Sequence, residues 1–201
     1  MSESTAPEPA PDRRPALMVV DDNAVALERI AHELHRRYAN DYRILCQPSA
    51  AVALRTLQTM REERAEVAIV LAAQGSSELA GEELLERVRG LYPLAKRGLL
   101  IDFGDWADGG TTDVIRRAMT RGVIDYYVLK PWRSPDELFH RTVSEFLHEW
   151  SRIDPTARRE MVVVGPQWAP RSHEIRTLLG RNGVPHTFHP SDSEEGRRWL
   201  A

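Results

Sequence analysis

Three charged residues stand directly after short apolar runs, and their side chains are of types that could do chemistry. Asp21 and Asp22 follow the run that ends at Val20, and Lys130 follows the run that ends at Leu129. Paired carboxylates attract a divalent cation such as Mg²⁺, although two of them hold it only weakly. A lysine brought close to them can instead neutralise their charge and lock the strand ends together.

The elements that must position these residues alternate between strands and helices. Apolar runs predict strands over residues 17–20, 42–46, 67–72, 98–103 and 126–129, and helical spacing predicts helices over 24–38, 49–60, 82–89, 111–120 and 135–150. Five such units indicate an α/β fold with a doubly wound parallel sheet, right-handed crossovers and helices on both faces. Sheets of this kind bind ligands outside the carboxyl ends of their strands, where the three charged residues stand.

The last of these helices has clear start signals. Ser134 can cap it, Pro135 suits the first helical position, and Glu137 completes a capping box. We therefore predict that the helix begins at Pro135, a few residues after Lys130, and runs to Trp150.

Composition and charge exclude several classes of protein. The 201 residues carry a net charge of −3 and have a pI of about 6.2, which gives no support for binding nucleic acid or an anionic membrane. No stretch approaches the roughly 18 apolar residues of a membrane helix, and the N-terminus lacks a signal-peptide pattern, so we predict a cytoplasmic protein. The single cysteine, Cys46, excludes an internal disulfide and is interpreted as a small buried apolar residue.

The chain divides into four segments on composition and pattern. Residues 1–15 are rich in proline without an apolar pattern and are predicted to form a disordered tail. The α/β domain takes residues 16–150, and residues 151–159 are interpreted as a linker. Residues 160–201 then predict a strand–helix–strand–helix unit of about 40 residues, too few to bury an independent core comfortably.

The order of the charged residues resembles that of response-regulator receiver domains. This family has an acidic pair after the first strand, a phosphate-accepting aspartate after the third, a serine or threonine after the fourth and Lys-Pro after the fifth. This sequence has Asp21-Asp22, Lys130-Pro131 and, at the family's aromatic switch position, Tyr127. The resemblance implies a receiver-like (flavodoxin-like) domain over residues 16–150, with a cis peptide bond before Pro131.

The middle of the receiver pattern is missing. Residues 67–72, aligned with the third strand, put Ala73 at the accepting aspartate, and Ile101 falls at the hydroxyl position. Phosphoryl transfer needs a nucleophile and a metal that neutralises developing charge, and alanine supplies neither a nucleophile nor a metal ligand. We therefore predict a pseudo-receiver without a cofactor, with at most weak Mg²⁺ binding at Asp21 and Asp22.

Three interpretations of this degenerate acidic pocket stay open. Asp21, Asp22 and Lys130 can be inherited structural groups without a signalling role. They can belong to a surface that signals through protein contacts without phosphate. The chain can also be a phosphorelay receiver with a displaced acceptor, such as Asp102 or Ser76.

The second unit resembles the start of a glutaredoxin, on residues 164–172 and 183–185. Glutaredoxins have a strand, a Trp-Cys-Pro-x-Cys-like turn, a helix and a Gly-Val-Pro turn into the next strand. Ala169 and Ser172 occupy the two cysteine positions here, so the unit cannot perform thiol–disulfide exchange. We expect Trp168 to pack at the strand end rather than to stack on a ligand.

The two pieces in this order resemble the N-terminal half of bacterial flavoenzymes that continue into a thioredoxin-reductase-like FAD module. The sequence has no Gly-x-Gly-x-x-Gly dinucleotide fingerprint. Our leading hypothesis is a regulatory module that is not an enzyme and contacts a protein partner, such as a sensor, or a second copy through the fourth and fifth strands. The alternative is the regulatory half or subunit of a FAD-dependent reductase, whose partner would be the flavin reductase module.

Overall fold

The chain forms two units in the computed structural model, which describes residues 12–75, 79–105, 109–153, 161–181 and 186–200. Unit 1 is Met1–Ile153 and unit 2 is Asp154–Ala201. Most of the predicted tail and linker lies outside the described residues.

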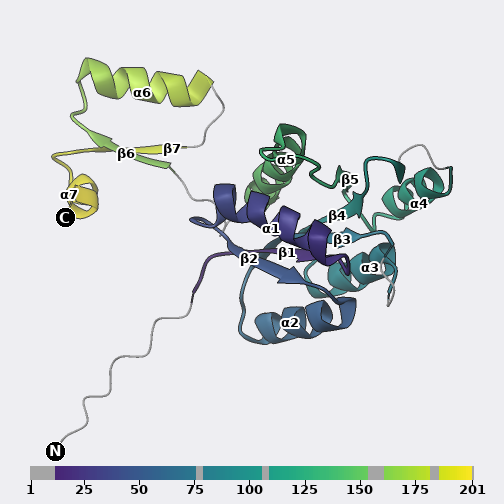
Figure 1. Ribbon diagram of the computed structural model, residues 1–201. Coiled ribbons are helices and arrows are strands. Elements are labelled where there is room, and N and C mark those ends of the chain that lie inside the picture. The colour runs from purple at the N-terminus through teal and green to yellow at the C-terminus, as the bar shows by residue number, and fades with distance from the viewer. Residues whose placement is uncertain (1–11, 76–78, 106–108, 154–160, 182–185, 201) are drawn as a thin grey trace, which may run out of the picture. The chain divides into compact units, whose positions relative to one another are not determined.

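Unit 1 is built on a parallel sheet of five strands in the order β2-β1-β3-β4-β5 (Figure 1). Every neighbouring pair of strands runs parallel, as the alternation of strands and helices requires. The predicted fold class is therefore confirmed. The strands are β1 (Ala16–Val20), β2 (Arg43–Gln47), β3 (Val67–Ala73), β4 (Lys96–Ile101) and β5 (Tyr126–Leu129).

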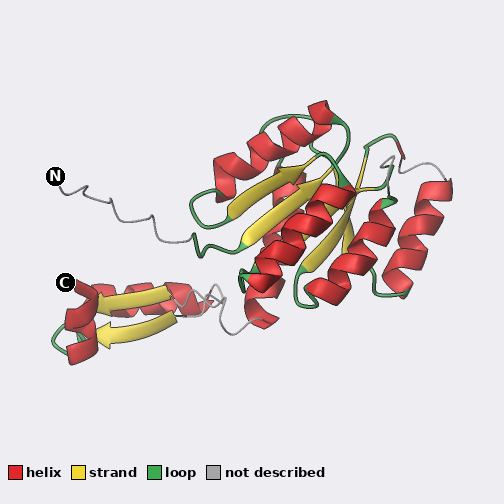
Figure 2. Cartoon of the chain, turned by 90° about the horizontal axis from the view of Figure 1, so that it is seen from below, coloured by secondary structure: helices red, strands yellow, loops and turns green. Residues whose placement is uncertain are grey.

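Helices cover both faces of this sheet, with α1 and α5 on one side and α2 and α3 on the other (Figure 1, Figure 2). Each of these helices turns an apolar stripe toward the sheet and leaves most of its charged residues in solvent, with Glu33 on α1 as a buried exception. The helices are α1 (Ala24–Tyr38), α2 (Ala50–Glu62), α3 (Gly81–Leu91), α4 (Gly109–Thr120) and α5 (Glu137–Ile153).

Burial along the strands follows their place in the sheet. The central strands β1 and β3 are buried at every position, because helices cover both of their faces. The edge strand β2 is only partly buried throughout. Cys46 on β2 is therefore half-buried rather than fully buried as predicted, and this burial raises the pKa of its thiol.

The start of α5 differs from the prediction. The helix begins at Glu137, and the carboxylate of Asp136 accepts a hydrogen bond from the backbone N–H of Phe139 at 3.2 Å, so Asp136 rather than Ser134 is the cap. The expected cis bond before Pro131 is also wrong. In the described part of the chain, the cis peptide bond is the one between Ser134 and Pro135.

Unit 2 has the predicted strand–helix–strand–helix order, with two parallel strands side by side (Figure 2). Among its described residues, the buried ones are Ser172 and Gly196, so little apolar area is removed from water. Trp168 is 88% exposed, and the prediction that it packs at the strand end is wrong. The elements are β6 (Met161–Gly165), α6 (Pro170–Arg181), β7 (His186–Pro190) and α7 (Glu194–Leu200).

No helix formed by the described residues is both long and apolar enough to cross a membrane.

Candidate functional site

The register of the sheet brings the predicted strand-end residues to one edge. Val20 lies beside Ala72, Ala73 beside Leu100, and Ile101 beside Leu129. The residues that follow these strand ends are therefore neighbours in space although they are far apart in sequence. Asp21 follows β1, Asp102 follows β4 and Lys130 follows β5.

Lys130 lies between two carboxylates. Its Nζ is 2.9 Å from Oδ2 of Asp21 and 3.0 Å from Oδ2 of Asp102. The side chain of Asp21 is 1% exposed, whereas that of Asp102 is 61% exposed. The Asp21 contact is an ion pair without hydrogen-bond alignment, while Oδ1 of Asp21 accepts the backbone N–H of Asn23 at 3.0 Å. Lys130 therefore neutralises a buried charge with one contact and a solvated charge with the other.

The pKa of Lys130 reports the balance of these contacts. Burial alone would lower this pKa, because it penalises the charged ammonium. Asp21 and Asp102 outweigh the burial and raise the pKa of Lys130 above its ordinary value. The lysine is therefore held charged at the mouth of the site.

A hollow of about 190 Å³ opens at this edge of the sheet. Most of the predicted site residues line it, and Tyr127 does not. The ring of Tyr127 instead stacks on that of Tyr126 with centroids 4.6 Å apart, and burial raises the pKa of Tyr127. The lining residues are Asp21, Asp22, Asn23, Ala73, Gln74, Gly75, Leu100, Ile101, Asp102, Asp105 and Lys130.

These residues fit a bound metal poorly. Mg²⁺ prefers several oxygen ligands, and the Ala73 methyl occupies the end of β3 without offering one. The Lys130 ammonium already forms an ion pair with Asp21, so that carboxylate is not free to bind a metal. No group of three potential metal-ligating side chains occurs among the residues that the structure describes. A weak site made by Asp21 and Asp22 stays a prediction.

An exposed aromatic pair beside the hollow was not predicted from the sequence. Phe103, just after β4, and Trp132, just after β5, are 67% and 61% exposed, with ring centroids 6.2 Å apart. The guanidinium of Arg133 lies 5.1 Å from the centroid of the Trp132 ring. Both aromatics follow strand ends by only a few residues, and this spacing is the signal that could have revealed the pair.

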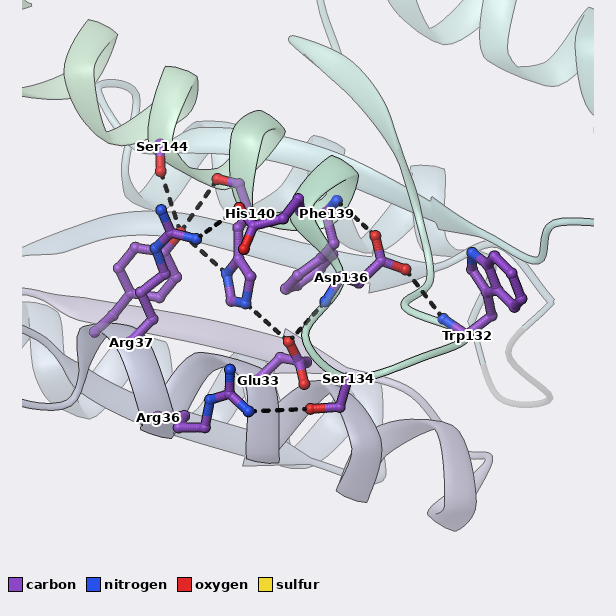
Figure 3. Close-up of polar contacts among 11 residues, drawn as sticks. Glu33, Arg36, Arg37, Trp132, Ser134, Asp136, Phe139, His140 and Ser144 are labelled. Carbon is purple, nitrogen blue, oxygen red and sulfur yellow. Dashed lines mark hydrogen bonds and ion pairs between the residues drawn. The ribbon is translucent and has the colours of Figure 1, made fainter.

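A buried polar cluster joins α1 to the start of α5 (Figure 3). Oε2 of Glu33 lies 2.8 Å from Nε2 of His140 and accepts the backbone N–H of Asp136 at 3.2 Å. The carboxylate of Asp136 in turn accepts the backbone N–H of Trp132 at 3.3 Å. Glu33, His140 and Asp136 are all buried. One continuous set of hydrogen bonds therefore runs from α1 to the exposed Trp132.

The other side of the His140 ring faces Tyr38. Nδ1 of His140 lies 3.3 Å from the Tyr38 hydroxyl, which is also 3.2 Å from the backbone carbonyl of His140 and 3.2 Å from Oγ of Ser144. Burial raises the pKa of Tyr38, so this hydroxyl keeps its proton. The cluster thus contains a carboxylate, an imidazole and two hydroxyls in a row.

Glu33 is ionised in this setting. Burial opposes its charge, but the Ser134 hydroxyl, the backbone N–H of Asp136 and His140 together lower the pKa of Glu33 below its ordinary value. The sequence carried a signal for this pair. Glu33 lies on the buried stripe of α1 and His140 lies on that of α5, positions where an apolar residue is the ordinary choice.

Unit 2 places its two altered cysteine positions at the start of α6. Ala169 precedes the helix, and Ser172 is buried in its first turn. A side chain on Gly165 would meet Oγ of Ser172 at 2.7 Å, which shows how closely the end of β6 approaches this turn. Neither position carries a thiol, so the turn has no group for disulfide exchange.

No protein-family model matches the sequence, and no curated protein matches it. Solved structures do resemble it. The signal receiver domain of an HD domain-containing protein from Pseudomonas fluorescens Pf-5 is 25% identical, with a TM-score of 0.56, over 76% of this chain and 97% of that chain. A response regulator receiver domain protein from Clostridium thermocellum is 19% identical, with a TM-score of 0.54, over 70% of this chain and 99% of that one.

Unit 1 has the receiver fold. A further structure with this fold is described as an adenylate cyclase from Rhodopirellula baltica, at 15% identity and a TM-score of 0.53, over 71% of this chain and 94% of that chain. At such identities the likeness shows the fold alone. The resemblance of unit 2 to glutaredoxins, and that of the two pieces in order to flavoenzymes, have no counterpart among these structures.

Proposed function

We propose that this chain is a receiver-like signalling module that is not phosphorylated at the usual aspartate position and acts through protein contacts. The observation that carries the proposal is the combination of the receiver fold with Ala73 at the carboxyl end of β3. Ala73 lines the hollow where Asp21 and Lys130 also lie. A receiver without a nucleophile at this position keeps the surface that the fold presents to other proteins, but it cannot form an aspartyl phosphate.

The state of Lys130 supports the same proposal. A lysine that serves phosphoryl transfer must be able to turn toward the transferred group. Lys130 is already held by Asp21 and Asp102, both within 3.0 Å of its ammonium. The positive charge of Lys130 is therefore already paired with two carboxylates and is not available to bind a phosphoryl group.

The first test is intact-mass spectrometry after incubation with acetyl phosphate and Mg²⁺. We expect no phosphoryl mass gain for the natural chain. An Ala73→Asp variant restores the carboxylate at the end of β3, and a gain in that variant alone would support the proposal that the missing carboxylate is what blocks phosphorylation.

The same measurement addresses a displaced acceptor. A stoichiometric, hydroxylamine-labile adduct on the natural chain would contradict the proposal and favour a phosphorelay receiver. Loss of that adduct in Asp102→Asn or Asp105→Asn would then identify the carboxylate, since both line the hollow. Ser76, the other displaced candidate, lies outside the described residues. The double variant Asp21→Asn, Asp22→Asn is the control for the acidic pair.

The proposed contact surface is the side of unit 1 that carries β5 and the segments after β4 and β5. It exposes large apolar side chains that a partner could cover, namely Phe103, Met119, Tyr126 and Trp132. A homodimer through this face is one form of the proposal, and sedimentation velocity of Trp132→Ala beside the natural chain distinguishes it from a contact with another protein. A monomeric natural chain would exclude the homodimer.

A second candidate function is the regulatory half or subunit of a flavin-dependent reductase. The observation that favours it is unit 2, whose described residues bury little apolar area and expose Trp168, Leu178 and Trp199. Such a unit is suited to packing against a further protein module. Binding of a purified flavin reductase module, lost in Trp168→Ala, would favour this candidate over the first.

A further inference from the structure

The Tyr38 hydroxyl has one proton to donate and three polar partners. It can therefore form a hydrogen bond with the His140 ring whether that ring is neutral or protonated. The partners are Nδ1 of His140, the backbone carbonyl of His140 and Oγ of Ser144, all within 3.3 Å. When the hydroxyl donates to Nδ1, the ring is neutral and its proton sits on Nε2, facing Glu33. When it donates to the carbonyl or to Ser144, its oxygen can accept a proton from Nδ1, and the ring is an imidazolium.

The two charge states differ in what surrounds the carboxylate of Glu33. An imidazolium ring makes a full ion pair with Glu33 at 2.8 Å inside the domain. A neutral ring leaves Glu33 as a buried anion without a compensating charge on the ring. That anion would keep the backbone N–H of Asp136, the nearby Ser134 hydroxyl and the neutral ring as polar neighbours, but it would lose the positive charge that the ring supplied. Loss of the ring proton therefore weakens the junction of α1 and α5.

The junction also sets the position of the segment after β5. Glu33 holds the backbone N–H of Asp136, and Asp136 holds the backbone N–H of Trp132 (Figure 3). Nearby, a guanidinium nitrogen of Arg29 on α1 donates to the carbonyl of Pro131 at 3.3 Å. Weakening of the Glu33 contact therefore reaches Trp132 through two hydrogen bonds.

We propose that the Glu33–His140 pair, with the Tyr38 hydroxyl as its adaptor, is a protonation-dependent latch that holds the start of α5 and the Trp132 segment against α1. The latch is closed while His140 carries a proton on both ring nitrogens. It loosens when Nδ1 gives its proton to solvent and the ring becomes neutral. The exposed pair of Trp132 and Phe103 then changes its position or mobility, which links proton activity to the surface beside the hollow.

Charged and polar groups of both elements surround the ring. Arg36 of α1 contacts Ser134 at 3.4 Å, and Arg37 of α1 pairs with Glu137 of α5 at 3.2 Å. Both contacts are exposed, and the two arginines keep their charge when the His140 ring loses its proton. The groups that face the ring or flank it are Glu33, Arg36, Arg37, Tyr38, Phe139, Ser134, Asp136, Glu137 and Ser144.

Nuclear magnetic resonance on the full chain tests the latch. Labelled histidine reports the protonation of His140, assigned by its loss in His140→Gln, and fluorinated tryptophan reports Trp132, assigned in Trp132→Phe. We expect the two signals to change with the same midpoint during a pH titration. In Tyr38→Phe the adaptor is gone and protonated Nδ1 has no partner, so both midpoints should move to lower pH by about one unit.

The control is His148→Gln, because His148 lies exposed on the same helix. This variant should leave both midpoints where they are. The proposal is wrong if His140 keeps one protonation state wherever the chain stays folded, or if Trp132 does not follow His140. It is equally wrong if Tyr38→Phe and the natural chain titrate together. None of these outcomes depends on whether the chain accepts phosphate.

Discussion

Lys130 illustrates how burial decides what a charged residue contributes. It pairs with Asp21, which water does not reach, and with Asp102, which stays largely solvated. An ion pair with a buried partner holds that partner's charge in place, whereas an exposed pair contributes little because water and salt screen it. The two carboxylates therefore have different structural roles although their distances to the ammonium are almost equal.

Lys130→Met should lower the free energy of unfolding by about 3 kcal/mol, because it leaves the Asp21 charge buried without a partner. Asp102→Asn should lower it by less than about 1 kcal/mol, because that contact is exposed. Urea denaturation of the two variants beside the natural chain measures both changes. Equal losses in the two variants would contradict the assignment of Asp21 as the residue that depends on Lys130.

Glu33 should make stability depend on pH on the acid side. Its pKa in the folded state is lower than the ordinary value of 4.5. The stability that its ionised form contributes is fully present above that value and is lost as the pH falls through the folded pKa. Urea denaturation between about pH 3 and pH 6 should therefore show a steeper loss for the natural chain than for Glu33→Gln. Parallel curves would show that Glu33 is not selectively stabilised in its ionised form.

At the scale of elements, the start of α3 lies too close to the end of β3 for a side chain to fit between them. An added Cβ on Gly81 would meet the backbone oxygen of Ala73 at 2.3 Å. Gly90, later in the same helix, has open space around its Cα. Close packing therefore requires the first glycine, whereas the second only lowers the helix propensity of α3.

Gly81→Ala should destabilise unit 1 by about 2 kcal/mol or more, because the strand end must shift to admit the methyl group. Gly90→Ala is the matched control in the same helix and should be neutral or stabilising by up to about 1 kcal/mol. Thermal unfolding followed by circular dichroism compares the two. A stable Gly81→Ala protein would mean that β3 and α3 can separate at little cost.

The start of α5 depends on one carboxylate with two tasks. Asp136 caps Phe139 and also holds the backbone of Trp132. Asp136→Ala should lower the free energy of unfolding by about 1–2 kcal/mol, whereas Asp136→Asn keeps an oxygen in place and should lose less. Denaturation in urea distinguishes them, and equal losses would indicate that charge rather than the hydrogen-bonding oxygen is what matters.

At the scale of the whole molecule, the two units differ in how much apolar area they bury. The buried apolar side chains of the described residues all belong to unit 1. Residues 12–153 should therefore unfold cooperatively as a separate fragment, with nearly the midpoint that unit 1 has in the full chain. Residues 161–201 alone should show no cooperative transition, because too little surface is removed from water. Differential scanning calorimetry of the full chain and both fragments measures this, and a cooperative transition in the short fragment would contradict it.

Much of the fold could be read from the sequence, because the relevant signals are local. Apolar runs and helical spacing located the five strands and five helices of unit 1, with boundaries that differ by a few residues at most. The start of α5 was placed too early, since Ser134 and Pro135 imitate a helix start that Asp136 provides. The exposure of Trp168 was also missed, because only the packing of unit 2 decides it.

The sequence by itself determined that Asp21, Asp22 and Lys130 would lie near one another. Each follows a strand of a parallel sheet, and the hydrogen bonds between such strands bring their ends to one edge. It also determined that Ala73 offers no nucleophile there. Tertiary structure alone decided that Lys130 closes on Asp21 and that Glu33 meets His140, a residue 107 positions away. The Glu33–His140 contact depends on how α1 and α5 pack on the same face of the sheet, and the Lys130–Asp21 contact depends on which carboxylate the lysine side chain reaches at the strand ends. No local pattern in the chain encodes either contact.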